Sequence, residues 1–494
     1  MIVPPTRSAL YLVSMKYLSW RWIALATAVL LQACSTAPSR DDTEFVRNAP
    51  VFASAFESGS IGRIKPLDRQ RTSWQLTLKN DNDDATLPAS FRTWFYFDMG
   101  NLSPTRPVTL QISGFGSRYP VMPVYSYDQK TWQHFRDEET VWQDCDGYAL
   151  LACKLTITKA FTSNHVWIAR TFPYTTQDLT AFLASIAGSP HLQREILGVT
   201  PVYQRPIELL TINDPDAKIE GVGGIEKKYI WIHARTHPGE TGPSYVLEGL
   251  IPRLLADDDL GRSLRSRYIF KIVPMHNPDG VIAGNYRTTP ASINLEENWT
   301  FEPDGSDAKG TSTPPPLENQ ALLRRGILPV LQVGGQFELA LNMHSSNAKV
   351  DMPAFFLPHF GDDAFEFGDA GQRLWQKQQH FIALTASRYD DRIGTENEDG
   401  GTRFLSSAFP ETWWWRSQQD KVTAMTLETT YGRGGFDHWV TQADLRQLGV
   451  AIAQAIDALG TSNAACAFMT GPVRPGCADA ATVPSEARSF PIAD

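Results

Sequence analysis

The chain carries a histidine and a glutamate three residues apart, in the stretch HARTHPGETGPSY, and a further histidine at the end of FELALNMH. His237 and Glu240 follow the apolar stretch KYIWI and precede a predicted helix, so they lie on a strand-to-helix loop. His344 ends another predicted strand. Alone, a His-x-x-Glu pair is usually a surface accident, but donors at the ends of two strands of an open α/β sheet can share one Zn²⁺. The pattern predicts one zinc ion per chain, held by these three residues, with a position left for water.

Two more residues have the chemistry that a zinc-activated water needs. Glu428, in TLETTYG, is a carboxylate in an otherwise apolar strand, where an unpaired charge is costly. It is either a buried ion-paired glutamate or the general base. Arg287, in NPDGVIAGNYRTT, is a candidate to stabilise an oxyanion, although loop arginines usually face solvent. His233 and His276 also end predicted strands, and we interpret both as structural.

The elements that position these residues fall into two blocks. Residues 45–172 show short alternating runs, such as SWQLTLKN and PVTLQISGF, which predict an antiparallel β-sandwich. Residues 173–460 alternate apolar strands with long helical stretches, which predict an α/β domain with a largely buried sheet. Residues 461–494 lack periodicity and are predicted to form a tail.

The first 33 residues have the features of an export signal. Basic side chains precede the apolar run IALATAVLLQA, which is too short to be a persuasive membrane span, and the true start is Met1 or Met15. LLQACS resembles a bacterial lipobox, which predicts lipidation of Cys34 as the mature N-terminus. Ser35 after it favours the outer membrane, with the chain facing the periplasm. An ordinary cleaved signal or a spanning anchor is the alternative.

The other cysteines form two close pairs, Cys145 with Cys153 and Cys466 with Cys477. In an oxidising compartment two local disulfides are the natural interpretation, whereas neither spacing is that of a zinc knuckle. The net charge of −9 and the lack of a basic cluster give no electrostatic support for nucleic-acid binding. The sequence predicts no particular oligomeric state.

Taken together, these motifs resemble the funnelin-type zinc metallocarboxypeptidases, and HPGET and GNYR resemble the cytosolic carboxypeptidase branch. The N-terminal block is similar to that branch in FESGSI, TWFYFDM, YSYDQKTW and FPYTTQDL, so the likeness covers about residues 52–460. It implies an α/β/α sandwich with a mixed eight-stranded sheet after the β-sandwich, and a peptide substrate. It also implies zinc held by His237, Glu240 and His344. The resemblance further makes Glu428 the base and Arg287 the group that polarises the scissile carbonyl.

One departure affects the substrate. Family members grip a terminal carboxylate with an Asn-Arg pair in LNRxW, but this chain has Glu296 and Glu297 in NLEENW. Two like charges about 4 Å apart in a partly screened cleft repel by roughly 4 kcal/mol. The upstream tyrosine that caps the substrate in the family has no counterpart in FPETWWW, where tryptophans 413–415 are candidates to close the cleft instead.

Several interpretations of that departure remain open. The glutamates could receive an amine-bearing end, as in cell-wall peptides with a lysine or diaminopimelate group, or Arg403 could replace the lost anchor. The chain could instead be a non-catalytic zinc-binding lipoprotein, or the two glutamates a solvated loop pair. The main prediction is a lipid-anchored zinc metallopeptidase that cleaves a peptide or amide bond near a substrate terminus.

Overall fold

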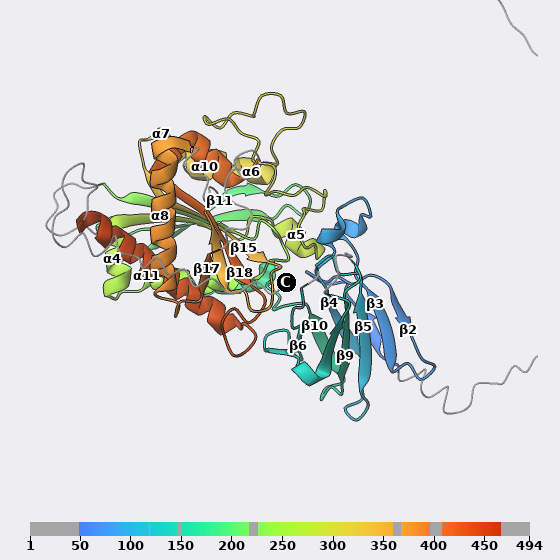
Figure 1. Ribbon diagram of the computed structural model, residues 1–494. Helices are drawn as coiled ribbons and strands as arrows, with labels where there is room; N and C mark the ends of the chain where they lie inside the picture. Colours follow the sequence, from blue (N-terminus) through green and yellow to red (C-terminus); the bar gives the residue numbers. More distant parts are fainter. Residues whose placement is uncertain are drawn as a thin grey trace, which may run out of the picture.

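Two blocks of secondary structure, a β-sandwich and a larger α/β unit, lie side by side in the computed structural model (Figure 1). The structure describes residues 49–117, 119–145, 151–216, 226–358, 367–395 and 408–465. The predictions for residues 1–33, Cys34, Arg403, Cys466 and Cys477 lie outside the described residues. Within the described part, no helix is long and apolar enough to cross a membrane.

The N-terminal block consists of two five-stranded sheets packed face to face. One sheet has the order β1 (Val51–Ala53), β4 (Tyr96–Gly100), β10 (His165–Ala169), β6 (Val124–Ser126) and β7 (Trp132–His134). The other has the order β2 (Ile64–Pro66), β3 (Ser73–Thr77), β5 (Val108–Ser113), β9 (Lys154–Lys159) and β8 (Thr140–Gln143). Alternate residues such as Val108, Leu110 and Ile112 point into the shared core. The predicted sandwich is confirmed, although β3 and β5 pair in parallel.

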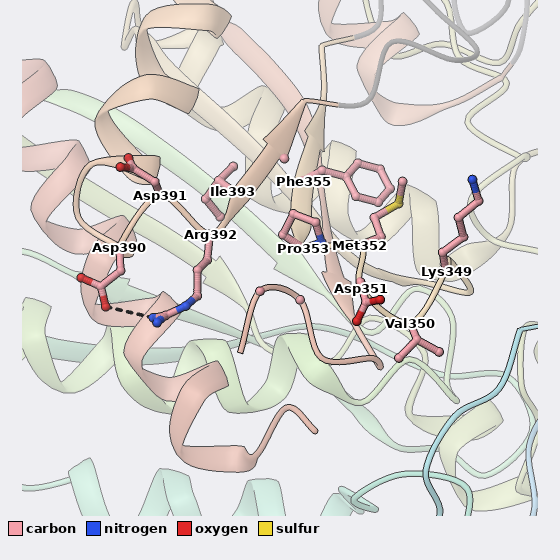
Figure 2. A pocket seen from close by; sticks show the side chains of 13 residues that line it. Lys349, Val350, Asp351, Met352, Pro353, Phe355, Asp390, Asp391, Arg392 and Ile393 are labelled. Atoms are coloured by element: carbon pink, nitrogen blue, oxygen red, sulfur yellow. Dashed lines mark hydrogen bonds and ion pairs between the residues drawn. The ribbon is translucent and has the colours of Figure 1, made fainter. Parts of the chain in front are cut away.

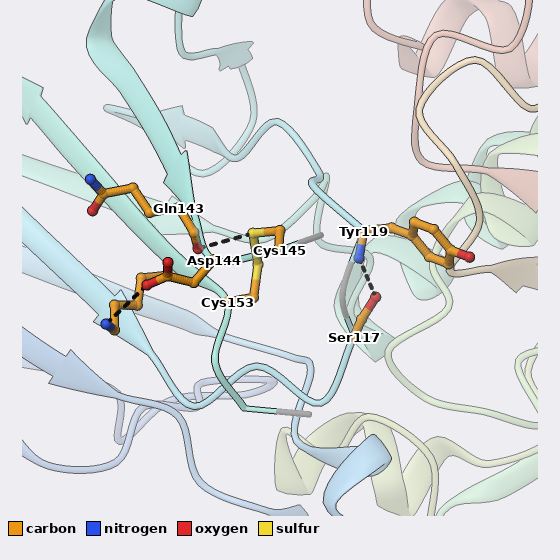
Figure 3. The surroundings of a disulfide bond; sticks show 7 residues. Ser117, Tyr119, Gln143, Asp144, Cys145 and Cys153 are labelled. Atoms are coloured by element: carbon orange, nitrogen blue, oxygen red, sulfur yellow. Dashed lines mark hydrogen bonds and ion pairs between the residues drawn. A yellow bond between two sulfur atoms is a disulfide. The ribbon is translucent and has the colours of Figure 1, made fainter. Parts of the chain in front are cut away.

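A disulfide joins Cys145 to Cys153, with Cα atoms 4.3 Å apart, near the ends of β8 and β9 (Figure 3). The predicted local pairing of these two cysteines is therefore present in the structure. Both cysteines are buried in the sandwich core.

The second block is built on one mixed sheet, as expected. Its strand order is β11 (Leu192–Val199), β12 (Pro206–Ile212), β14 (Tyr268–Val273), β13 (Lys228–Ala234), β15 (Phe337–Ser346), β18 (Thr423–Thr430), β16 (Ala354–Leu357) and β17 (Ile393–Thr395). The central strands β14, β13, β15 and β18 run parallel, so their carboxyl ends meet at one edge. Strand β16 runs antiparallel to β18 and therefore begins at that same edge.

Helices cover both faces of this sheet (Figure 1). Ile230 and Ile232 of β13 face the core formed with α3 (Gly242–Leu255), α4 (Asp259–Arg267), α8 (Gly368–Ala386) and α11 (Gln442–Ala465). Trp231, between them, faces the other core, with α6 (Leu317–Ala321), the π-helical turn η4 (Leu322–Ile327), α7 (Leu328–Gln332) and α10 (Pro410–Gln418). This alternation explains why the strand is apolar throughout.

The remaining helices are short or lie at the junction of the two blocks. They are α2 (Thr176–Ile186), α5 (Pro278–Ala283) and the 3₁₀ turns η1 (Asp81–Asp83), η2 (Ala89–Phe91), η3 (Asp137–Glu139) and η6 (Gln419–Lys421). The last helix, α11, continues past the predicted boundary at residue 460. Gly460 lies inside this helix, where a Cβ would lie 2.7 Å from the Tyr268 hydroxyl. Close packing, and not helix termination, accounts for this glycine.

Candidate metal centre

The loop that carries His237 and Glu240 is fixed by a buried arginine. Arg235 follows β13 with a φ of 61° and turns its guanidinium back under the loop. It donates to the carbonyl oxygen of Pro238 at 2.6 and 3.1 Å and to that of Tyr174 at 3.0 Å. Gly239 is required at the top of the loop, since a Cβ there would lie 2.6 Å from the Tyr286 ring. The loop therefore presents both metal-binding candidates from a rigid support.

The three predicted ligands meet at the carboxyl edge of the sheet. His344, on β15, places Nδ1 2.8 Å from Glu240 Oε2 and 3.0 Å from His237 Nδ1. His237 Nδ1 also lies 3.0 Å from Glu240 Oε1. One donor atom from each residue lies within 4.8 Å of the others, and all three residues are buried. Two imidazoles and a carboxylate that converge in this way fit Zn²⁺, with a fourth position left for water.

The local electrostatics suit a bound cation. Burial, reinforced by the guanidinium of Arg287, lowers the pKa of His237, and a neutral imidazole is the form that binds a metal. Against the effect of burial, the imidazoles of His237 and His344 hold the pKa of Glu240 below its usual range. Against the effect of burial, the carboxylates of Glu296 and Glu240 raise the pKa of His344, so this imidazole must give up a proton before it can bind a metal.

Both imidazole rings turn Nδ1 toward the other donors and Nε2 away from them. His237 Nε2 lies 3.1 Å from Asn294 Oδ1, and His344 Nε2 lies 3.2 Å from Glu296 Oε2. An acceptor on the outer nitrogen fixes the ring orientation and the tautomer of a metal-binding histidine. Both acceptors come from the stretch NLEENW. The sequence did not indicate this role for Asn294, because asparagine is common in loops for unrelated reasons.

Zinc binding is expected to stabilise the fold, because the ion binds the native arrangement and not the unfolded chain. At a free zinc concentration about a thousandfold above Kd, the free energy of unfolding should rise by about 4 kcal/mol. Calorimetric melting of chelated and zinc-loaded protein measures the shift, with His344→Ala as control. An equal shift in His344→Ala would show that zinc binds elsewhere.

Glu428 lies next to the ligands in the neighbouring strand. It is the register partner of His344 between β15 and β18, and it is only partly exposed. Its Oε2 has no hydrogen-bond partner among the described residues. Burial, reinforced by the Glu240 carboxylate, raises the pKa of Glu428 to about 8. A bound divalent cation would oppose this shift, because an opposite charge favours the carboxylate. Glu428 thus lies where it could act on a water molecule held by these ligands.

Arg287 belongs to a loop that the β-sandwich holds in place. Asp81, in η1, accepts hydrogen bonds from the backbone N–H groups of Tyr286, Arg287 and Thr288 at 2.6, 2.8 and 2.7 Å. The Thr288 hydroxyl adds a fourth at 3.0 Å. The guanidinium stacks over the Phe91 ring at 5.5 Å. Asp81 and Phe91 are contributions of the sandwich that the sequence did not reveal.

The two glutamates of NLEENW lie in different environments. Glu296 is buried between His344 and Asn342, whose Nδ2 donates to its Oε1 at 2.9 Å. Glu297 keeps 53% of its side chain exposed and lies 3.5 Å from an Arg287 nitrogen. The pair therefore forms neither a single acidic wall nor a solvated loop pair. Of the two, only Glu297 is both exposed and paired with Arg287.

The other candidates from the sequence pack as structural residues. His233 accepts from the Trp231 indole at 3.2 Å, and His276 lies 3.1 Å from the Thr236 hydroxyl. Both are buried and outside the ligand group. Trp413 and Trp414 belong to the core beneath the sheet, so these two do not close the cleft.

A cavity of about 820 Å³ opens at the same edge of the sheet (Figure 2). Phe355, in its wall, is the register partner of Glu428 between β16 and β18. Its charged lining includes Lys349, Asp351 and the ion pair of Arg392 with Asp390 at 2.9 Å. Asp391 lines the cavity as well, so three carboxylates face two cations and the lining carries a small excess of negative charge.

Fold and site together define a class, an α/β metallohydrolase fold with a His-Glu-His centre behind a β-sandwich. Residues 179–350 match the zinc carboxypeptidase family, and residues 52–171 match the cytosolic carboxypeptidase N-terminal domain. The chain belongs to the zinc carboxypeptidase family and has an N-terminal domain of the cytosolic carboxypeptidase type.

Named relatives agree with this assignment. Cytosolic carboxypeptidase 6 of Caenorhabditis elegans is 31% identical over 51% of this chain and 55% of its own length. The human protein of that name is 31% identical over 50% of this chain and 49% of its own length. The chain thus spans about half the length of these curated relatives. A metallo-carboxypeptidase from Burkholderia cenocepacia has the same fold, with a TM-score of 0.65 and 24% identity over 84% of this chain and 99% of its own.

Proposed function

We propose that the protein is a zinc-dependent hydrolase that cleaves a peptide or amide bond near one end of its substrate. The observation that carries the proposal is the convergence of His237, Glu240 and His344 beside Glu428. A non-catalytic zinc-binding protein has no need of a carboxylate with an unpartnered oxygen next to the ligands. Family membership supports a peptide as the substrate.

When bound, zinc would supply a Lewis acid and acidify a water molecule. The carboxylate of Glu428 is placed to take the proton of the attacking water and to pass it to the leaving amine. Arg287 is placed to stabilise the negative charge that develops on the carbonyl oxygen. Asp81 holds the backbone on which Arg287 sits, so that the guanidinium is oriented before the substrate arrives.

The substrate end is proposed to be other than a free carboxylate held by an Asn-Arg pair, since that pair is replaced here. Glu297 is half exposed in front of Arg287, and a carboxylate about 4 Å from it would be repelled by roughly 4 kcal/mol. A neutral or amine-bearing end avoids this repulsion. Burial of Glu296 removes it from such recognition, so selection for an amine would depend on Glu297. The neighbouring cavity offers room for the rest of the substrate.

Mass spectrometry of reaction products tests the proposal on zinc-loaded protein that begins after Cys34. The substrates pair free C-terminal carboxylates with amidated, lysine-ended and diaminopimelate-containing peptides, and chelated protein is the control. We expect faster cleavage next to neutral or amine-bearing ends. Faster loss of single residues from ordinary free C-termini would refute the proposed preference. No cleavage of any peptide would refute the hydrolase.

We also propose that the protein is an exported lipoprotein, anchored through Cys34 in the outer membrane and facing the periplasm. The basic and apolar start of the chain and the lipobox-like LLQACS support this. Incorporation of labelled palmitate in the wild type, absent in Cys34→Ala, would agree with it. Equal labelling of both, or of neither, would contradict it.

A further inference from the structure

Three residues of one short stretch contact the catalytic groups. In NLEENW, Asn294 contacts His237, Glu296 contacts His344, and Glu297 pairs with Arg287. The resemblance to the family suggests that this stretch grips the substrate. In the structure, two of these three residues, Asn294 and Glu296, contact the metal-ligand candidates instead.

Three polar contacts fix the orientation of Glu296. Its Oε1 accepts from Asn342 Nδ2 at 2.9 Å, its Oε2 lies 3.2 Å from His344 Nε2, and its backbone N–H donates to Asn294 Oδ1 at 3.1 Å. Only 8% of its side chain is exposed. Asn342 and His344 are two residues apart on β15, so both point to the same face of the sheet and clamp the carboxylate between them.

We infer that Glu296 is a positioning residue for the metal ligand His344 and does not bind substrate. A carboxylate that accepts the Nε2 proton leaves Nδ1 with its lone pair directed at the other ligands and makes that nitrogen more basic. The inference rests on the proposed zinc site, but it concerns metal binding and not the substrate.

Metal affinity measured without substrate tests the assignment. Apo-protein variants compete with a chromophoric chelator for zinc, which gives Kd directly. In Glu296→Gln, which keeps the size of the side chain and removes the charge, Kd should rise by about 10- to 100-fold. The matched control is the adjacent Glu297→Gln, for which Kd should stay within about twofold.

Further measurements separate positioning from other roles. Melting of the apo-proteins shows whether Glu296→Gln is folded, and Glu296→Asp, which keeps the charge one methylene further back, should have an intermediate Kd. The visible spectrum of the Co²⁺ form should change in Glu296→Gln and not in Glu297→Gln, because only His344 is reoriented. An unchanged Kd and spectrum, with a changed KM for lysine-ended peptides, would overturn the inference in favour of substrate recognition. Because no substrate enters the titration, a failure of peptide hydrolysis would leave its outcome unaffected.

Discussion

Glu428→Gln protein is expected to bind zinc as the wild type does and to hydrolyse peptides about 10²- to 10⁴-fold more slowly. The amide has the shape of the carboxylate but cannot accept the proton of the attacking water. The substitution leaves the ligand set intact, because Glu428 makes no hydrogen bond to His237, Glu240 or His344 among the described residues. Metal content and single-turnover hydrolysis, measured on the same preparation, check the unchanged zinc binding and the slower reaction.

The control for this result is His344→Ala, which should lose metal and activity together. Wild-type activity in Glu428→Gln would exclude Glu428 as the base. Loss of zinc in the same variant would instead make it a metal ligand.

Asp81→Ala is expected to lower both the stability and the activity of the protein. It removes one carboxylate that accepts from three backbone N–H groups and a hydroxyl. A buried donor left without a partner costs about 1–3 kcal/mol, so the free energy of unfolding should fall by about 3 kcal/mol or more. The kcat/KM should fall as well, because the loop that orients Arg287 is released. Urea unfolding and steady-state kinetics measure the two effects.

Asp83→Asn is the matched control, since Asp83 lies in the same turn and is exposed, and asparagine tolerates its left-handed φ of 57°. The free energy of unfolding of this variant should lie within about 0.5 kcal/mol of the wild-type value. Equal effects of the two substitutions would show that the turn as a whole, and not the Asp81 carboxylate, matters. Asp81→Asn should lie between them, because its amide keeps one acceptor oxygen and turns an N–H₂ group toward donors.

The sequence predicted the parts of the site that depend on local order. Strand, loop and helix signals around HPGET placed His237 and Glu240 at a strand end, and the apolar run before His344 did the same. The alternation of apolar strands and helices predicted the mixed sheet in the same way. Strand order is set by packing between distant segments, so the pairing of β16 next to β18 has no local signal.

Contacts between distant segments account for what the sequence missed. Asp81 lies 205 residues before Tyr286, and nothing in NDNDD distinguishes the one buried aspartate from its exposed neighbour. Glu296 and Glu297 are adjacent and chemically identical, yet the turn of the backbone buries one and exposes the other. In the sequence, Asn342 is one residue of a mainly apolar strand. Its hydrogen bond to Glu296 depends on which loop covers that strand, and this has no local signal.

The anchoring of residues 286–288 by Asp81 also limits how the molecule can move. A hinge opening between the sandwich and the α/β unit would break all the hydrogen bonds to that carboxylate together, and Arg170 of the sandwich would leave Asn347. Such an opening would displace Arg287 just as the substrate entered. Substrate must therefore reach the zinc site while the two units stay docked, and binding should leave their relative orientation unchanged.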